Sequence, residues 1–224
     1  MKRAVQTSES IELGILLALS GGLMDAYSYI ERGQVFANAQ TGNILLFGIH
    51  LSEGQFGTAL QYFIPVLAFT AGIALSDLVR IRDDRMKMHW RQLAVLLEAL
   101  ILIAVSFIPL QFNLPANSLT SFACGIQVQS FRKIHGNGVA TTMCIGNLRS
   151  GTQNLVAFLQ THDPEKLESG GLYFGIIFCF ALGAVCGNFL IGFLGQHAIL
   201  VSAVLLLAAV FLMFADRERA NQGM

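Results

Sequence analysis

Residues 21–43 read GGLMDAYSYIERGQVFANAQTGN. An aspartate, Asp25, lies well inside the apolar run 13–30, and a cluster of amides, Thr and Gly follows that run. A carboxylate deep in a membrane helix costs about 2.5 to 3.5 kcal/mol on the insertion scale. The stretch therefore predicts a helix whose acid faces protein or water, followed by a break from helical structure inside the apolar layer.

The rest of the chain has the composition of a membrane protein. Of its 224 residues, 54% are hydrophobic and 12% are charged, against about 25% charged in a typical soluble domain. The net charge is zero, so the chain offers no overall positive field for nucleic acid. Six runs approach the roughly 17 to 25 residues that cross a bilayer: 13–30, 59–79, 93–110, 114–131, 171–195 and 198–215. We expect an all-α integral membrane protein with six transmembrane helices.

The positive charges predict the orientation of these helices. With six spans, thirteen of the fourteen Lys and Arg residues fall on one side, and only Arg32 falls on the other. Cytoplasmic loops carry the excess of Lys and Arg, so both termini are expected in the cytoplasm. An eight-helix alternative, in which 35–51 is a further span, would place the basic loop before residue 92 outside and is less favoured.

The two halves of the chain, 1–110 and 111–224, resemble each other when the sequence is shifted by 104 residues. The aligned residues are polar or small: Asp25 with Gln129, Gly42 with Gly146, and Asn43 with Asn147. Each half has three spans, an odd number, so the halves are expected to run in opposite directions as a 3+3 inverted repeat of one membrane domain. Secondary transporters often follow this plan. Helix breaks are expected after the first and fourth helices, at 34–51 and 138–148.

Small residues recur every four positions in two of the expected helices, and this spacing lets helices approach closely in lipid. The packing residues are Ala68, Gly72 and Ser76 in the second helix and Gly175, Gly183 and Gly187 in the fifth. A homodimer interface is the alternative use for these stripes.

The polar residues of the two breaks are the candidates for binding a solute or lining its path, because amides and hydroxyls can satisfy freed backbone groups or offer ligands. They are Asp25, Asn38, Gln40, Thr41, Gly42 and Asn43 in the first half and Gln127, Gln129, Thr141, Thr142, Gly146 and Asn147 in the second. Asp25 and Glu98 are the candidates for a proton path. The alternatives are a structural Asp25 that pairs with Arg32 or binds backbone at the break, and a Glu98 that meets an interior partner. Asp77 is expected to pair with Arg80.

Motifs of common enzyme classes are missing from the sequence. Neither a nucleotide-binding glycine loop, a GxSxG nucleophile nor an HExxH metal site occurs. The four cysteines show no metal-ligand spacing and are expected to be free thiols. We expect neither enzymatic activity, a cofactor nor a bound metal.

The first break carries a resemblance to a known family. Its glycine, Asp-Ala pair, following aromatic, Gly-x-x-Phe and Thr-Gly-Asn elements are Gly22, Asp25, Ala26, Tyr29, Gly33, Phe36, Thr41, Gly42 and Asn43. The second half offers Gly125, Gln127, Arg132, Lys133, Val139, Thr141, Thr142 and Gly146, with Ile145 where a threonine is usual. This pattern resembles the YoaK-type family, a domain of unknown function. The resemblance implies a six-helix protein of the bacterial inner membrane and no established activity.

The function that these features favour is secondary transport or export of a small solute, with the lipid bilayer and that solute as partners. A chain of six helices is small for a transporter, so a homodimer is consistent with it. The alternative is a membrane scaffold or partner subunit without transport activity.

Overall fold

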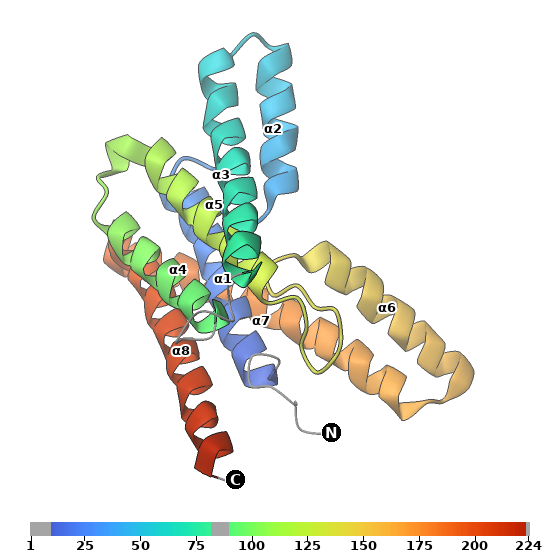
Figure 1. The fold of residues 1–224 in the computed structure, drawn as a ribbon. Coiled ribbons are helices and arrows are strands. Elements are labelled where there is room, and N and C mark those ends of the chain that lie inside the picture. The colour runs from blue at the N-terminus through green and yellow to red at the C-terminus, as the bar shows by residue number, and fades with distance from the viewer. Residues whose placement is uncertain (1–9, 82–89, 223–224) are drawn as a thin grey trace.

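The computed structural model describes residues 10–81 and 90–222, with side chains as far as Phe214. In this part of the chain the structure is helical, apart from one isolated bridge between Ile134 and Asn137. Figure 1 shows the helices α1 (Ile11–Glu31), α2 (Gln40–Ser52), α3 (Phe56–Ile81), α4 (Trp90–Ser106), α5 (Asn113–Ser130), α6 (Cys144–Thr161), α7 (Pro164–Leu194) and α8 (Ile199–Gln222). Short 3₁₀ turns at Leu110–Phe112 and Gly195–Ala198 precede α5 and α8.

Each of the six predicted ranges contains a helix, although α4 ends at Ser106, four residues before the predicted end at 110, and the structure adds α2 and α6. Three stretches are long and apolar enough to cross a membrane: Ile11–Glu31, Phe56–Ile81 and Pro164–Phe214, the last of which runs from α7 into α8. Helix α4 has only 17 residues. Helix α5 contains Asn, Ser, Thr and Gln, and these polar residues lower its hydropathy.

Large apolar side chains cover much of the outer surface. Phe193 is 85% exposed, Ile81 79% and Phe211 73%, and many more such residues lie along α2, α3, α7 and α8. Soluble monomers rarely expose apolar patches of this extent. The surface therefore fits a protein embedded in lipid.

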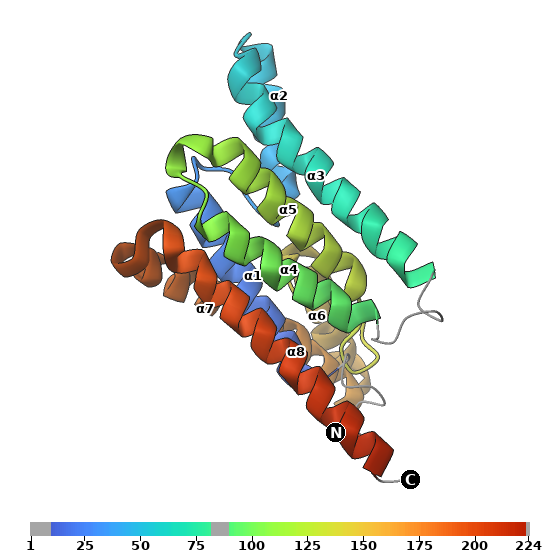
Figure 2. The same ribbon diagram turned by 60° about the vertical axis from the view of Figure 1, so that its left-hand side comes forward.

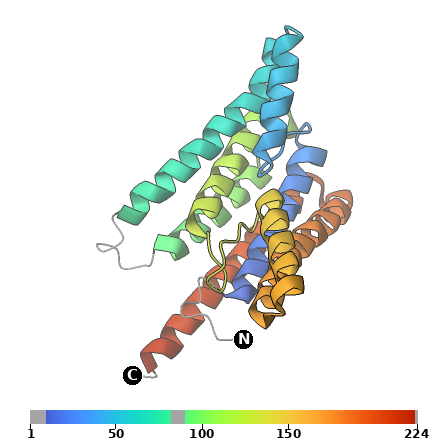
Figure 3. The same cartoon turned by 90° about the vertical axis from the view of Figure 1, so that its right-hand side faces the viewer.

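The helices pair in a pattern that stays the same when α1–α4 exchange places with α5–α8. Helix α1 packs on α7 and α8, and correspondingly α5 packs on α3 and α4. Helix α2 packs on α3 as α6 packs on α7, and α4 packs on α8. Figures 2 and 3 show the same pairs from two further directions. The two halves of the sequence are therefore interleaved in space.

Glycines create the closest contacts in this pattern. A Cβ added at Gly72 of α3 would lie 2.1 Å from Phe122 O of α5, and one at Gly183 of α7 would lie 2.1 Å from Leu19 O of α1. Gly187 also meets α1, and Ser76 Oγ lies 3.0 Å from Ser130 Oγ of α5. In contrast, an added Cβ at Gly175 would have no neighbour within 4 Å, so this residue of the expected stripe lies on an open face.

Part of the predicted basic surface lies outside the described residues: Lys2, Arg3, the segment 82–89, and the side chains of Arg217 and Arg219. The predicted ion pair between Asp77 and Arg80 is not found. Asp77 accepts a hydrogen bond from Gln129 Nε2 instead, because α3 packs on α5 and brings the two side chains together.

Candidate functional site

Two asparagines hold the non-helical segments that lead into α2 and α6 in the same way. Asn43 Oδ1 accepts a hydrogen bond from Phe36 N at 3.0 Å, and its Nδ2 donates to Phe36 O at 2.7 Å. Asn147 Oδ1 accepts from Ala140 N at 3.2 Å, and its Nδ2 donates to Ala140 O at 2.6 Å. Each asparagine thus satisfies both backbone groups of the residue seven positions earlier, as buried backbone outside a helix requires.

Asp25 connects α1 to the segment that leads into α2. Its side chain is buried, with 8% exposed. Asp25 Oδ1 accepts a hydrogen bond from Asn38 N at 2.7 Å, and Asn38 Nδ2 donates back to Gly21 O of α1 at 3.1 Å. Of the two structural partners considered for this acid, the structure shows the backbone of the break. Arg32 binds other groups.

The amides at the start of α2 extend toward the second half of the chain. Asn43 Nδ2 donates to Gln40 Oε1 at 2.9 Å. Gln40 Nε2 donates to Ala37 O at 2.8 Å and reaches Ser121 Oγ of α5 at 3.4 Å. The first turn of α2 is therefore held by its own break and by a helix of the other half.

Glu98 of α4 is fully buried beside Gln127 of α5. In one orientation of the Gln127 amide, Nε2 donates to Leu17 O at 3.3 Å and to Thr141 Oγ1 at 3.2 Å. After a half-turn, Nε2 donates to Glu98 Oε1 at 2.6 Å and to Oε2 at 3.3 Å, and the amide oxygen accepts from Thr141 Oγ1.

These two amide orientations match the two protonation states of Glu98. A neutral acid can donate its O–H to the amide oxygen in the first orientation, whereas a carboxylate accepts from Nε2 in the second. Gln127 and its partners Leu17, Glu98 and Thr141 thus join α1, α4, α5 and the segment before α6. A proton gained or lost at Glu98 would therefore change the hydrogen bond that holds Thr141.

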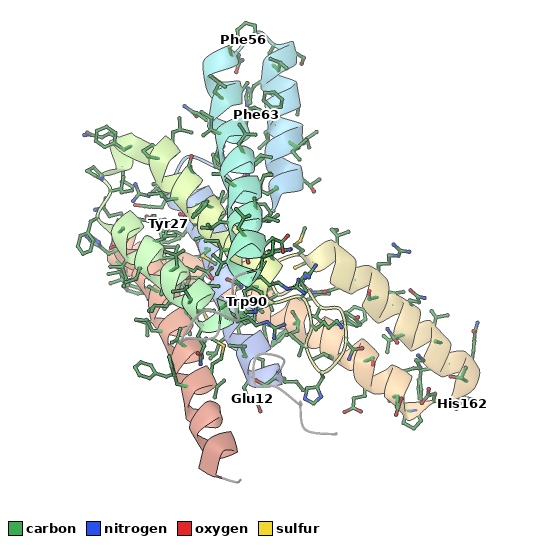
Figure 4. The ribbon with its side chains drawn as sticks, in the orientation of Figure 1. Glu12, Tyr27, Phe56, Phe63, Trp90 and His162 are labelled. Atoms are coloured by element: carbon green, nitrogen blue, oxygen red, sulfur yellow. The ribbon has the colours of Figure 1, made fainter. Side chains whose placement is uncertain are left out.

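Arg32, the residue after α1, has no exposed surface. Its Nε donates to Tyr27 Oη at 2.7 Å, and its Nη2 donates to Val105 O at 3.2 Å and Ile108 O at 2.8 Å. Its Nη1 has no partner. Tyr27 lies inside the bundle on α1 (Figure 4). The guanidinium thus binds one carbonyl in the last turn of α4 and one just after this helix, rather than the carboxylate of Asp25.

The remaining predicted site residues do not all lie beside Asp25 and Glu98. Thr142 is buried, its methyl group faces Gly21, and its Oγ1 has no partner in the described part of the chain. Gly42 packs against the ring of Phe36. Thr41 and Gly146 are exposed, and Gln129 binds Asp77 of α3 rather than Asp25 or Glu98.

Sequence reasoning considered Arg32 only as a partner for Asp25, and it missed the burial of the guanidinium. The charge distribution held a signal for it. Arg32 is a single cation on the side that the other thirteen Lys and Arg residues avoid in the six-span arrangement. A cation kept on that side is more easily explained by a specific site than by anchoring at the surface.

Comparison with known proteins confirms the predicted family. The DUF1275 family, described as a protein of unknown function, matches residues 13–212. The chain is also 27% identical over 180 residues to the UPF0700 transmembrane protein YoaK of Bacillus subtilis (strain 168), an alignment that covers 76% of this chain and 79% of the relative. No solved structure matches the chain.

Proposed function

The chain belongs to the DUF1275 family, and from that premise we propose that this membrane protein is a secondary transporter of a small solute. The observation that carries the proposal is the pair of partly buried breaks before α2 and α6, each closed by a buried asparagine, together with the buried carboxyl groups of Asp25 and Glu98. Ionisable groups inside membrane segments typically serve ion or substrate pathways.

The proposed architecture is a 3+3 inverted repeat. Helices α1, α3, α4, α5, α7 and α8 are the six spans, and α2 and α6 are half-helices that begin inside the bundle. The pairing of helices, unchanged by exchange of the two halves, supports this plan, as do the matching Asn43 and Asn147 contacts. The bias of Lys and Arg supports cytoplasmic termini in a bacterial inner membrane.

The start of each half-helix is the proposed solute site. Backbone N–H groups at a helix N-terminus carry partial positive charge, and unwound segments beside them offer carbonyl groups. In the described conformation Asp25, Asn43 and Asn147 are enclosed, with at most 8% of each exposed. Opening of this site toward either side of the membrane would then require one half of the repeat to move against the other.

Glu98 is the proposed coupling site, and the coupling ion is a proton. The half-turn of the Gln127 amide that accompanies protonation changes the bond to Thr141, which lies just before α6. Proton binding would in this way alter how the second break is held. Asp25 holds the first break through Asn38 N and serves the solute site.

The test begins with a thermal-stability screen of the purified chain against organic acids, amino acids, sugars and monovalent and divalent cations. The solute that raises the unfolding midpoint is then followed into proteoliposomes that contain a pH-sensitive dye. Wild type is expected to take up this solute together with protons. Asp25→Asn is expected to insert and fold but to lose uptake. Glu98→Gln is expected to keep solute binding and lose the proton signal.

Two results would contradict transport. One is a screen in which none of these classes stabilises the protein. The other is uptake that does not exceed the uptake of empty liposomes for any screened solute, in wild type and in Asp25→Asn alike. In that case Asp25→Asn would change only the thermal stability.

A scaffold or partner subunit is the second candidate, and one observation favours it. Added Cβ atoms at Gly171 and Gly175 of α7, which are four residues apart, would meet nothing within 4 Å, so these two glycines lie on an open face of the helix. Small residues on a lipid-facing helix are suited to close association with another helix. A stable homodimer or heteromeric complex that loses its partner on Gly175→Leu would support this function.

A further inference from the structure

A pocket of about 210 Å³ with a mixed polar and apolar lining lies beside Arg32, where α1 ends and α5 begins. Its polar lining residues are Arg32, Gln61, Gln111, Asn113 and Asn117. They come from the segment after α1, from α3, and from the turn and first residues of α5. The lining is unusual for an apolar bundle because it combines one guanidinium with four amides.

The charge of Arg32 is not neutralised by protein. An arginine side chain stays protonated, and all of its hydrogen-bond acceptors here are neutral: one phenol and two carbonyls. In the described part of the chain no carboxylate forms an ion pair with it. The carbonyls at the end of α4 carry only partial negative charge. Nη1 is left without a partner although the side chain has no exposed surface.

The neighbouring amides are also incompletely satisfied. Asn117 Nδ2 donates to Arg32 O at 2.7 Å, but Asn117 Oδ1 has no partner. Asn113 Oδ1 has none either. Buried polar groups without partners are costly in a folded protein. The residues that line this pocket thus include an unneutralised cation, and beside it one N–H group and two amide oxygens have neither a partner nor accessible surface.

The geometry points to a binding site for a small organic carboxylate in this pocket. The carboxylate lies against Arg32, neutralises its charge and accepts from amide N–H groups of the lining, and a hydroxyl or amino group on the same molecule donates to an amide oxygen of the lining. The volume holds several water molecules, at about 30 Å³ each in the liquid. It therefore suits an acid of a few carbons better than a halide ion. This site does not depend on the proposed transport.

The experiment measures the thermal unfolding midpoint of the full chain in detergent, in a buffer whose only anion is a bulky sulfonate. Sodium acetate, lactate and chloride are titrated separately, and sodium sulfonate at equal ionic strength is the control. Lactate, and acetate more weakly, is expected to raise the midpoint saturably, by about 4 °C or more at a hundredfold excess over its dissociation constant. Chloride is expected to act no more strongly than the sulfonate.

Gln61→Glu is the decisive variant, because Arg32→Gln would also remove three hydrogen bonds of the fold. A glutamate at position 61 supplies a carboxylate to the pocket from the protein itself. The variant is expected to fold and to lose the response to lactate. Gln153→Glu, on the exposed surface of α6, is the matched control and is expected to respond as wild type does.

Two outcomes would overturn the inference. In one, lactate raises the unfolding midpoint of wild type no more than the sulfonate does, and Arg32 then serves only to bind Tyr27 and the carbonyls of Val105 and Ile108. In the other, Gln61→Glu responds to lactate as wild type does, and the acid then binds elsewhere. A response to chloride as strong as the response to lactate would also reject a carboxylate site in favour of a general anion site.

Discussion

At the scale of single residues, the buried polar side chains mostly replace hydrogen bonds that the helices cannot supply. Asn43 and Asn147 each satisfy the donor and the acceptor of one backbone residue in a break. An amide suits this task because it is neutral and offers both a donor and an acceptor. A carboxylate of the same size offers only acceptors, and it would bring a negative charge beside a carbonyl oxygen.

We therefore expect Asn147→Asp to lower the free energy of unfolding by about 1 to 3 kcal/mol, since the partly buried Ala140 O loses its donor and gains a negative charge beside it. Asn43→Asp is expected to cost a similar amount through Phe36 O. The measurement is thermal or denaturant unfolding of the purified variants.

Asn154→Asp is the matched control, because Asn154 Nδ2 donates only to Ser150 O within its own helix. This control is expected to change stability by a few tenths of a kcal/mol. Equal losses at positions 147 and 154 would show that the contact with Ala140 carries no special stabilisation.

At the scale of helices, the bundle depends on two crossings, α1 with α7 and α3 with α5, and each has a glycine on both helices. Gly22 meets Phe180 O of α7, and Gly183 meets Leu19 O of α1. Gly72 meets Phe122 O of α5, and Gly125 meets Phe69 O of α3. Each helix of a pair therefore presents a glycine to the backbone of the other. Two backbones at this distance gain dispersion contacts that a Cβ on either side would prevent.

Gly72→Ala is expected to destabilise the protein by about 1 to 3 kcal/mol, because the new Cβ would lie 2.1 Å from a backbone oxygen and α3 must move away from α5. Gly192→Ala is the control, since an added Cβ there meets nothing within 4 Å. The control is expected to be neutral or slightly stabilising through the higher helix propensity of alanine. Unfolding midpoints that fall equally for both variants would contradict the role of the crossing.

The hydropathy of the sequence predicts where the helices lie, but it says less about which helices contact one another. A helix occupies most of each predicted range, because long apolar runs leave few alternatives in lipid. Helices α2 and α6 were expected as breaks, since both begin among Thr, Gly and Asn residues that are typical of turns. Their helical continuation depends on packing against α3 and α7, which local sequence does not reveal.

The candidate site was also predictable only in part. The polar motif pointed to Asp25, Asn43 and Asn147, which are buried in the structure. The contact between Glu98 and Gln127 joins residues that are distant in sequence, and it follows from the packing of α4 on α5. Such contacts need a tertiary arrangement that periodicity and composition do not specify.

At the scale of the whole molecule, two helical hairpins extend from the bundle in different directions. Figure 4 shows Phe56 at the tip of the α2–α3 hairpin and His162 at the tip of the α6–α7 hairpin, far from one another. An inverted repeat would place these two tips on opposite sides of the bilayer. The apolar residues exposed along both hairpins fit contact with lipid below the tips.

This arrangement can be tested with single cysteines in a variant whose four native cysteines are replaced by alanine. Glu53→Cys and Lys166→Cys place a thiol near each tip, at positions that are exposed. In intact inverted and right-side-out vesicles, an impermeant maleimide is expected to label the two positions from opposite sides, with position 166 on the cytoplasmic side. Labelling of both positions from one side would reject the inverted repeat.

The glycine crossing of α1 with α7 also has a consequence for biosynthesis. Gly22 leaves the ribosome about 160 residues before Gly183, a delay of roughly 8 to 30 s at about 5 to 20 residues per second. During that interval the insertion machinery, lipid or a chaperone must cover the face of α1 around Gly22. A nascent chain that stalls before α7 would leave this face without its partner helix, and it would be a natural substrate for membrane proteases.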